Sequence, residues 1–238
     1  GVKHVVWSTL EDTRKLMSPD DTRMPILQGR FRVPHFDAKS EADAAFAGLP
    51  TTYLLVSFYW DNLYMFGLAP KKDDTGVHSW AFPMGTAKLA GIDKDDIGRA
   101  AYGIFKGGSQ YIGKRIGIAG EHVSFDEMSQ KLSKGLGVGP VKYTALDANL
   151  FRSFGFPGAD EYGNMFQVYR DFEKEVNEIR SVEQTRALVG GSPNTFDQWL
   201  AKNKAAVLAA ANPAPGRRAT GQAGSGRPGF PRSLVAAN

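Results

Sequence analysis

The sequence VPHFDAKSEADAAFAGLPTTYLLVS, residues 33–57, decides the fold class. Its first part predicts a helix that opens at Pro34, a residue favoured in the first helical turn, and stops at the Gly-Leu-Pro sequence of residues 48–50. Residues 51–57 (TTYLLVS) form a short apolar run typical of a buried strand. A similar run, residues 2–7 (VKHVVW), lies before the helix. A strand, a helix and a second strand in this order indicate a βαβ unit, and therefore an α/β protein with a parallel sheet.

The 238 residues fit one large domain or two small ones, and their composition changes along the chain. Residues 1–66 contain the βαβ unit. Residues 67–212 are expected to supply a further sheet strand and a smaller mixed α/β C-terminal lobe for a substrate or a partner. Residues 213–238 are rich in Pro, Gly and Arg, and we expect this tail to be disordered.

Several elements of the C-terminal lobe have clear local signals. The sequences SFDE at residues 124–127 and TFDQ at residues 195–198 are capping boxes that predict helix starts. An apolar stripe over residues 162–179 predicts one long amphipathic helix. Residues 111–118 are a strand candidate.

The net charge of +4 lies in the tail, which holds four arginines and no acid. Setting these four aside leaves 25 basic residues against 25 acidic ones in residues 1–212, so we expect no specific nucleic-acid binding. No apolar run approaches the roughly 20 residues of a membrane span, so we expect no membrane association. The chain has no cysteine, which excludes disulfides and thiolate chemistry and is typical of a reducing compartment, so we expect a cytoplasmic protein.

Common catalytic and metal-binding motifs are absent from the sequence. It contains no G-x-S-x-G, no H-E-x-x-H and no P-loop, and its four histidines are scattered. Asp93, Asp95 and Asp96 precede a helical apolar pattern, and a helix N-terminus explains them better than a calcium site. The glycines of residues 135–139 follow a helix and indicate its C-cap. We therefore expect no metal site.

One group of residues has the chemistry of a binding site. His35 and Lys39 lie four residues apart in the predicted helix, so they share one face. Ser8 and Thr9 follow the preceding strand, and open parallel sheets bind ligands beyond the carboxyl ends of their strands. A hydroxyl, an ammonium and an imidazole at that edge are suited to hold a sugar or carbonyl oxygen and to exchange a proton. The alternative is that Lys39 is a solvated helix charge and His35 a helix-entry residue.

Five segments together resemble the NmrA-like family, atypical relatives of the short-chain dehydrogenases. In chain order they are GVKHVVWSTL (1–10), VPHFDAKSEAD (33–43), SFYWDN (57–62), DDIG (95–98) and FGFPGAD (154–160). The resemblance implies a partial Rossmann-type parallel sheet with a smaller C-terminal lobe, and NADP or NAD as the cofactor. It also implies one of two functions: a redox sensor and regulator, or a reductase of small quinone or carbonyl acceptors.

The resemblance assigns roles to particular residues. Short-chain dehydrogenases carry a Y-x-x-x-K motif, and His35 and Lys39 stand at its two ends. By this resemblance Lys39 holds the nicotinamide ribose, and Ser8 or Thr9 occupies the hydroxyl position after the strand. His35 replaces the usual acid tyrosine, so a reductase of this kind would be a non-standard one. Two further residues resemble the loop that lines the nicotinamide and substrate pocket: Tyr59 and Asn62.

The glycine-rich fingerprint of the family does not precede the first strand of this sequence. The resemblance places Gly1 near the family's fifth strand. We therefore expect the adenosine-binding half to be absent and the strand of residues 2–7 to have an apolar edge open to another chain. Such an edge favours a protein partner or a homo-oligomer. An alternative function follows, in which a truncated module binds no dinucleotide and acts through protein–protein contacts.

Overall fold

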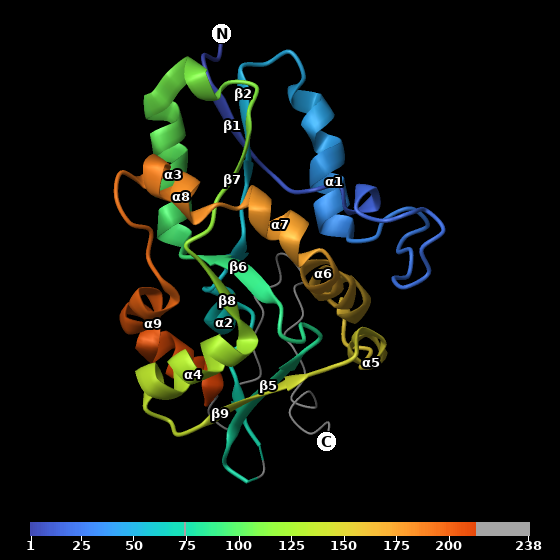
Figure 1. Ribbon diagram of the computed structural model, residues 1–238, viewed down its shortest axis with the longest axis vertical. Helices are drawn as coiled ribbons and strands as arrows, with labels where there is room; N and C mark the ends of the chain where they lie inside the picture. The colour runs from blue at the N-terminus through green and yellow to red at the C-terminus, as the bar shows by residue number, and fades with distance from the viewer. Residues whose placement is uncertain (74, 213–238) are drawn as a thin grey trace, which may run out of the picture.

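The structure is a computed structural model, of which residues 1–73 and 75–212 are described. The tail expected to be disordered, residues 213–238, lies outside the described residues. The described strands form three sheets of three strands each, and Figure 1 shows helices on both sides of them in an elongated molecule.

The first sheet is the parallel one that the βαβ pattern predicts, which confirms the α/β class. Its order is β1 (Val5–Thr9), β2 (Thr51–Leu55) and β7 (Arg115–Gly117), and α1 (Pro34–Ala42) connects β1 with β2. In Figure 1 this sheet lies between α1 on one side and α3 and α8 on the other. Among the described strands β1 pairs with β2 alone, so β1 is an edge strand.

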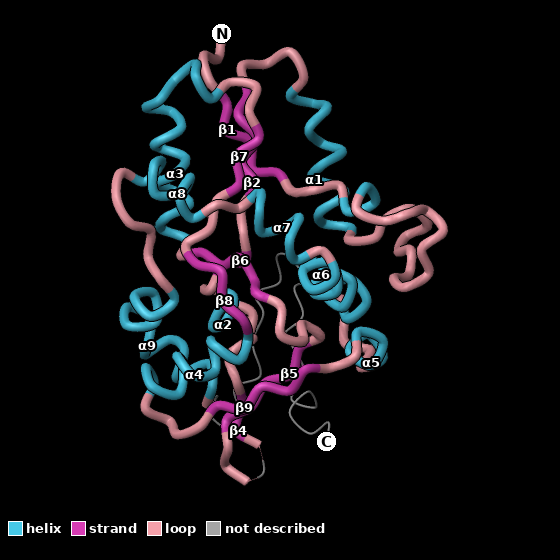
Figure 2. Tube along the Cα trace, viewed as in Figure 1, coloured by secondary structure: helices cyan, strands magenta, loops and turns pink. Residues whose placement is uncertain are grey.

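The other two sheets mix parallel and antiparallel pairs (Figure 2). One contains β3 (Phe58–Tyr59), β6 (Lys88–Ile92) and β8 (Glu121–Ser124), and the other contains β4 (Lys71–Lys72), β5 (His78–Phe82) and β9 (Val141–Ala145). Strand β6 pairs with β3 in parallel and with β8 antiparallel. Strand β5 pairs with β9 in parallel and with β4 antiparallel. The division of the chain at residue 66 stays a prediction.

The remaining helices pack around these sheets. The α-helices are α2 (Asn62–Met65), α3 (Lys94–Gly107), α4 (Phe125–Leu136), α5 (Ala148–Ser153), α6 (Ala159–Asp171), α7 (Glu173–Ile179), α8 (Val182–Val189) and α9 (Phe196–Ala211), and the short 3-10 helices are η1 (Thr13–Lys15), η2 (Asp43–Phe46) and η3 (Gly108–Tyr111). Both predicted capping boxes are present, at Ser124 and Thr195. The Asp93 side chain caps α3 by accepting from the Asp95 N–H, and Gly137 caps the end of α4 in the left-handed conformation.

The predicted single helix over residues 162–179 is wrong. It is two helices, α6 and α7, separated at Phe172, whose φ of −121° and ψ of 35° leave the helical region. The break lets α7 bond to the start of β6. There the Glu173 carboxylate accepts from the Lys88 N–H at 2.8 Å, and the Asn177 amide donates to the Lys88 carbonyl at 2.8 Å. Tertiary hydrogen bonds therefore accompany a break that the apolar periodicity does not reveal.

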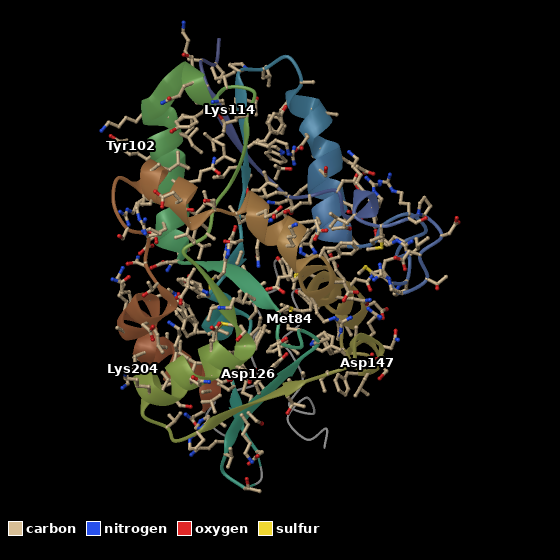
Figure 3. The ribbon with its side chains drawn as sticks, in the orientation of Figure 1. Met84, Tyr102, Lys114, Asp126, Asp147 and Lys204 are labelled. Atoms are coloured by element: carbon tan, nitrogen blue, oxygen red, sulfur yellow. The ribbon has the colours of Figure 1, made fainter. Side chains whose placement is uncertain are left out.

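The core between these elements is rich in aromatic side chains. Trp60 and Trp199 are fully buried, with ring centroids 6.2 Å apart. Met84, labelled in Figure 3, also has no exposed surface, whereas Tyr102 on the outer face of α3 is 69% exposed. None of the helices in residues 1–73 and 75–212 is long and apolar enough to cross a membrane.

Helices α3 and α8 approach each other at a glycine. A Cβ atom on Gly103 would lie 2.0 Å from the carbonyl oxygen of Leu188, so we expect Gly103→Ala to lower the free energy of unfolding by about 1–3 kcal/mol. Gly98→Ala on the same helix is the control, because a Cβ there meets nothing within 4 Å. The control should stabilise the protein by about 0.5–1 kcal/mol. Urea denaturation measures the free energy of unfolding of both variants. Equal values for Gly103→Ala and Gly98→Ala would contradict the close approach of the two helices.

Candidate functional site

The carboxyl ends of the parallel strands form one edge of the first sheet. Strand β1 ends at Thr9, so Ser8 and Thr9 are the last two residues of this strand and do not follow it as expected. Strand β2 ends at Leu55 and β7 at Gly117. Just beyond β2 and β7, the Ser57 hydroxyl donates to the Ile118 carbonyl at 2.8 Å and joins the two segments. This is the edge at which open parallel sheets bind their ligands.

Lys39 connects α1 to the end of β1. Its ammonium donates to the Ser8 carbonyl at 3.1 Å and to Ser8 Oγ at 3.2 Å. The Thr9 hydroxyl, which has no exposed surface, donates to the Lys39 carbonyl at 3.4 Å. Lys39 is half-buried, and burial lowers the pKa of its ammonium below the ordinary value. The structure therefore brings Ser8 to the incompletely solvated Lys39 ammonium, whereas Thr9 contacts the backbone of Lys39.

His35 bonds to α6. Its Nδ1 atom lies 2.5 Å from Glu161 Oε1, and its backbone N–H donates to the same oxygen at 2.9 Å. The hydrogen bond from His35 lowers the pKa of Glu161 below the ordinary value. Among the described residues no hydrogen bond joins His35 to Lys39 or Ser8, so a site shared by His35 and Lys39 stays a prediction.

In the sequence, Tyr59 and Asn62 lie on either side of a buried aspartate, Asp61. Tyr59 packs against the core, and burial raises the pKa of its hydroxyl. Asn62 is the first residue of α2 and is partly buried. Between them the Asp61 carboxylate, 1% exposed, accepts from Lys94 Nζ at 2.8 Å and from the Tyr64 hydroxyl at 2.5 Å. Asp61 therefore fixes this turn, and the contact of Tyr59 and Asn62 with a ligand stays a prediction.

Asp37 fixes the start of α1 and has no exposed surface. Its carboxylate accepts from the Thr13 N–H and the Thr13 hydroxyl, both at 2.7 Å, and from the Arg32 N–H at 2.8 Å. These bonds hold both ends of the loop between β1 and α1, so they determine where α1 presents His35 and Lys39. The sequence does not reveal this role, because the helix dipole already explains an acid in a first helical turn.

A buried ion pair lies close to the same edge. Arg180, between α7 and α8, has no exposed surface, and its guanidinium contacts the Glu11 carboxylate through Nη1 and, at 2.8 Å, through Nη2. Its Nε donates to the Val56 carbonyl at 3.0 Å, just after β2. Burial alone would lower the pKa of Arg180, but the charge of Glu11 and the hydrogen bonds to it raise that pKa above the ordinary value. The pair therefore fixes the end of α7 to the segments that follow β1 and β2.

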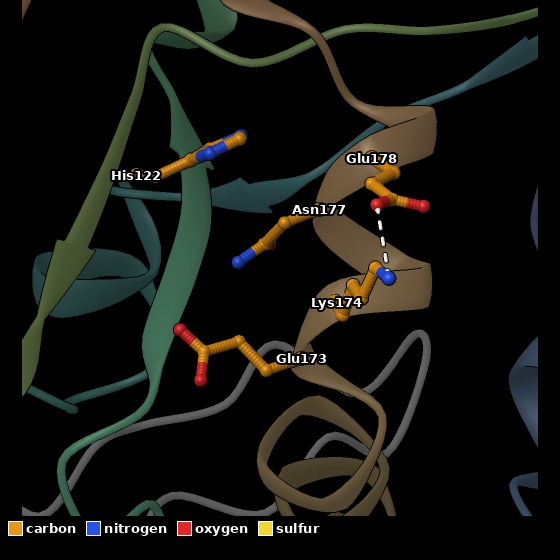
Figure 4. A pocket seen from close by; sticks show the side chains of 5 residues that line it. All are labelled: His122, Glu173, Lys174, Asn177 and Glu178. Carbon is orange, nitrogen blue, oxygen red and sulfur yellow. Dashed lines mark ion pairs between the residues drawn. The ribbon is translucent and has the colours of Figure 1, made fainter.

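A hollow of about 400 Å³ lies between α7 and β8 (Figure 4). Five residues line it: His122, Glu173, Lys174, Asn177 and Glu178. None of these is a predicted site residue. His122 Nε2 lies 2.8 Å from the Arg180 carbonyl, so the hollow adjoins the buried ion pair. The described residues contain no group of three His, Asp or Glu side chains placed to hold a metal ion.

Comparison with known proteins gives a family and a fold. The NmrA-like family profile matches residues 1–200. The chain is similar to the structure of NmrA, a negative transcriptional regulator, in complex with NADP, at 20% identity and a TM-score of 0.64 over 84% of this chain and 64% of that one. It is also similar to an Escherichia coli NADPH-dependent quinone oxidoreductase complexed with NADPH, at 20% identity and a TM-score of 0.59 over 87% of this chain and 66% of that one.

A third similar structure is the triphenylmethane reductase of a Citrobacter species complexed with NADP(H). The identity is 16% and the TM-score 0.59, over 85% of this chain and 65% of that one. This chain therefore spans 64–66% of the length of the three structures. At these identities the likeness shows the fold alone, and that fold is the expected Rossmann-type α/β one.

Proposed function

This chain belongs to the NmrA-like family, and we propose that it binds a nicotinamide dinucleotide, NADP or NAD, at the carboxyl ends of β1 and β2. In this proposal Lys39 holds the nicotinamide ribose, with Ser8 and Thr9 beside it. The observation that carries the proposal is the half-buried Lys39 ammonium at the end of β1. A lysine that serves only as a solvated helix charge extends into water, whereas this one gives up part of its solvation.

The groups around Lys39 suit a ribose hydroxyl. An ammonium has three N–H donors, and within the described part of the chain Ser8 accepts two of them. One donor therefore remains for a ligand oxygen. Ser8 Oγ accepts from Lys39, and no residue among 1–73 and 75–212 accepts from its O–H, which can therefore donate to a second ligand oxygen.

The function that these groups support best is a reductase of small quinone or carbonyl acceptors. When bound, the reduced nicotinamide supplies a hydride. The chain holds the ribose through Lys39 and supplies a proton to the acceptor oxygen through His35, which stands where the motif usually has a tyrosine. A histidine exchanges protons near neutral pH, so it suits this task without a tyrosine.

A redox sensor is the second candidate function. It is favoured by the similarity to NmrA, a negative transcriptional regulator, in complex with NADP, and by the histidine at the tyrosine position. A sensor binds the dinucleotide without turnover, and its affinity for a protein partner depends on the redox state of the dinucleotide. A third function, a module that binds no dinucleotide, would use the edge of β1 for protein–protein contacts.

Two measurements on the chain separate these functions. Fluorescence titration with NADPH and NADH measures binding, and absorbance follows cofactor oxidation in the presence of small quinones and carbonyl compounds. The reductase predicts saturable binding and oxidation that depends on the acceptor. Binding without oxidation of any acceptor would favour the sensor, and no binding at millimolar cofactor would contradict both and favour the protein-binding module.

A further inference from the structure

The contact between His35 and Glu161 orients an imidazole ring. One carboxylate oxygen, Glu161 Oε1, lies 2.5 Å from the ring nitrogen Nδ1 and 2.9 Å from the backbone nitrogen of the same histidine. The ring also meets Phe36 edge-on, with centroids 4.7 Å apart at 85°. Phe36 is itself buried and packs edge-on against Tyr169 of α6. Two independent contacts therefore fix the ring.

Only one of the two ring nitrogens is engaged by Glu161. An ionised carboxylate accepts hydrogen bonds and cannot donate them, so Nδ1 must carry a proton toward Glu161. The histidine side chain is 42% exposed. Nε2 is therefore the atom left to exchange a proton with a ligand or with water.

We propose that Glu161 is the positioning residue for proton transfer by His35, an inference that rests on the proposed reductase function. As an imidazolium paired with Glu161, His35 donates its Nε2 proton to the acceptor oxygen while the acceptor carbon receives the hydride. The remaining proton stays on Nδ1, facing Glu161. A proton from the solvent then returns to Nε2 and restores the pair, so the reduction consumes one hydride from the reduced nicotinamide and one solvent proton.

Glu161 belongs to a polar row on α6 whose other members bond to the loop before α1. Asn164, one helical turn further on, donates to the Arg32 and Pro25 carbonyls at 2.6 and 3.0 Å. Gln167, at the next turn, donates to the Arg23 carbonyl at 3.1 Å. Asn164 and Gln167 thus hold the loop that leads into α1, whereas Glu161 contacts a titratable ring in the first turn of α1 itself.

The competing explanation is a purely structural contact between α1 and α6. The ring nitrogen of His35 that carries the proton distinguishes this explanation from the positioning role. Long-range ¹H–¹⁵N spectra of the cofactor-free protein, recorded where His35 is neutral, report which nitrogen carries the proton. We expect Nδ1 in the wild type and a mixture of Nδ1 and Nε2 in Glu161→Ala. Asp160→Ala is the matched control, because it removes the same charge from the first turn of α6 and should leave the His35 signals unchanged.

Turnover gives the second readout. Glu161→Ala should lower kcat about tenfold or more and leave KM for the dinucleotide within about twofold, because the acid is misplaced while Lys39 is intact. His35→Ala should lower kcat by a similar factor, and the double variant should be no slower than His35→Ala alone.

The possible failures are distinguishable. A neutral wild-type His35 with its proton on Nε2, or a Glu161→Ala variant with unchanged tautomer or unchanged kcat, would overturn the role of Glu161. An absence of dinucleotide binding or turnover in the wild type would instead contradict the proposed function, and the NMR result would still decide whether Glu161 positions the ring.

Discussion

Lys39→Met is expected to weaken NADPH binding by roughly 10- to 100-fold, because it removes a charged hydrogen-bond donor from the ribose. Methionine keeps an unbranched apolar stem against β1, so the fold around Ser8 is retained. Fluorescence titration measures the dissociation constant. Lys106→Met, at an exposed lysine of α3, is the control and should leave the affinity unchanged. Wild-type affinity in Lys39→Met would contradict the proposed contact with the ribose.

The same substitution should not lower the thermal stability. Burial lowers the pKa of Lys39, so the folded protein holds this proton less tightly than the unfolded chain does. The charged lysine therefore costs stability at neutral pH, and this cost fades as the pH rises through the lowered pKa. We therefore compare the difference in melting temperature, Lys39→Met minus wild type, at two pH values. This difference should be more positive at neutral pH than at alkaline pH. A lower melting temperature than that of Lys106→Met at neutral pH would mean that Lys39 is a structural residue.

Arg180→Met is expected to lower the free energy of unfolding by about 3–5 kcal/mol, the typical cost of removing one partner from a buried ion pair. The variant leaves the Glu11 carboxylate without its counter-ion and the Val56 carbonyl without its donor. Urea denaturation measures the loss. The segments after β1 and β2 should also lose protection from hydrogen exchange, because Arg180 fixes them to α7.

Two further variants test whether the loss of stability comes from the burial of the pair between Arg180 and Glu11. Arg186→Met removes an exposed arginine that pairs with Glu183 at 2.9 Å, and it should change stability by less than about 1 kcal/mol. The double variant Arg180→Met/Glu11→Leu should recover much of the loss, because it removes both charges. A single Arg180→Met variant as stable as Arg186→Met would contradict the account of this pair.

The sequence predicts the elements whose signals are local. Pro34 opens α1, the apolar run of residues 51–57 contains β2, and the capping boxes at Ser124 and Thr195 start α4 and α9. Each depends on residues within one turn or one strand, so a single sequence suffices. The predicted strand over residues 111–118 is shortened to β7, because a 3-10 helix that ends at Tyr111 is followed by a turn at residues 112–113 and the strand begins only at Arg115.

Elements defined by distant partners are not predictable in this way. Strand β6 has the sequence KLAGI, which lacks the alternation and the β-branched run of a typical strand. Its glycine is explained by packing, since a Cβ on Gly91 would lie 2.1 Å from Nε1 of Trp60. The break at Phe172 similarly accompanies the bonds of α7 to Lys88, a residue far away in the sequence.

One part of the candidate site is predictable from the sequence, and another part is not. The position of Ser8 near Lys39 follows from the rule for the carboxyl ends of parallel strands, and the hydrogen bonds place them together. Helical spacing puts His35 on the face of Lys39 but does not identify its partner. That partner, Glu161, lies 126 residues away, in a first helical turn where an acid needs no further explanation.

Saturation-transfer NMR on NADP⁺ with the wild-type chain and Lys39→Met shows directly whether Lys39 holds the nicotinamide ribose, because it reports which ligand protons contact the protein. We expect the strongest transfer to the nicotinamide ring and its ribose, and loss of that transfer in Lys39→Met. No transfer to these protons in the wild type, or equal transfer in Lys39→Met, would contradict it.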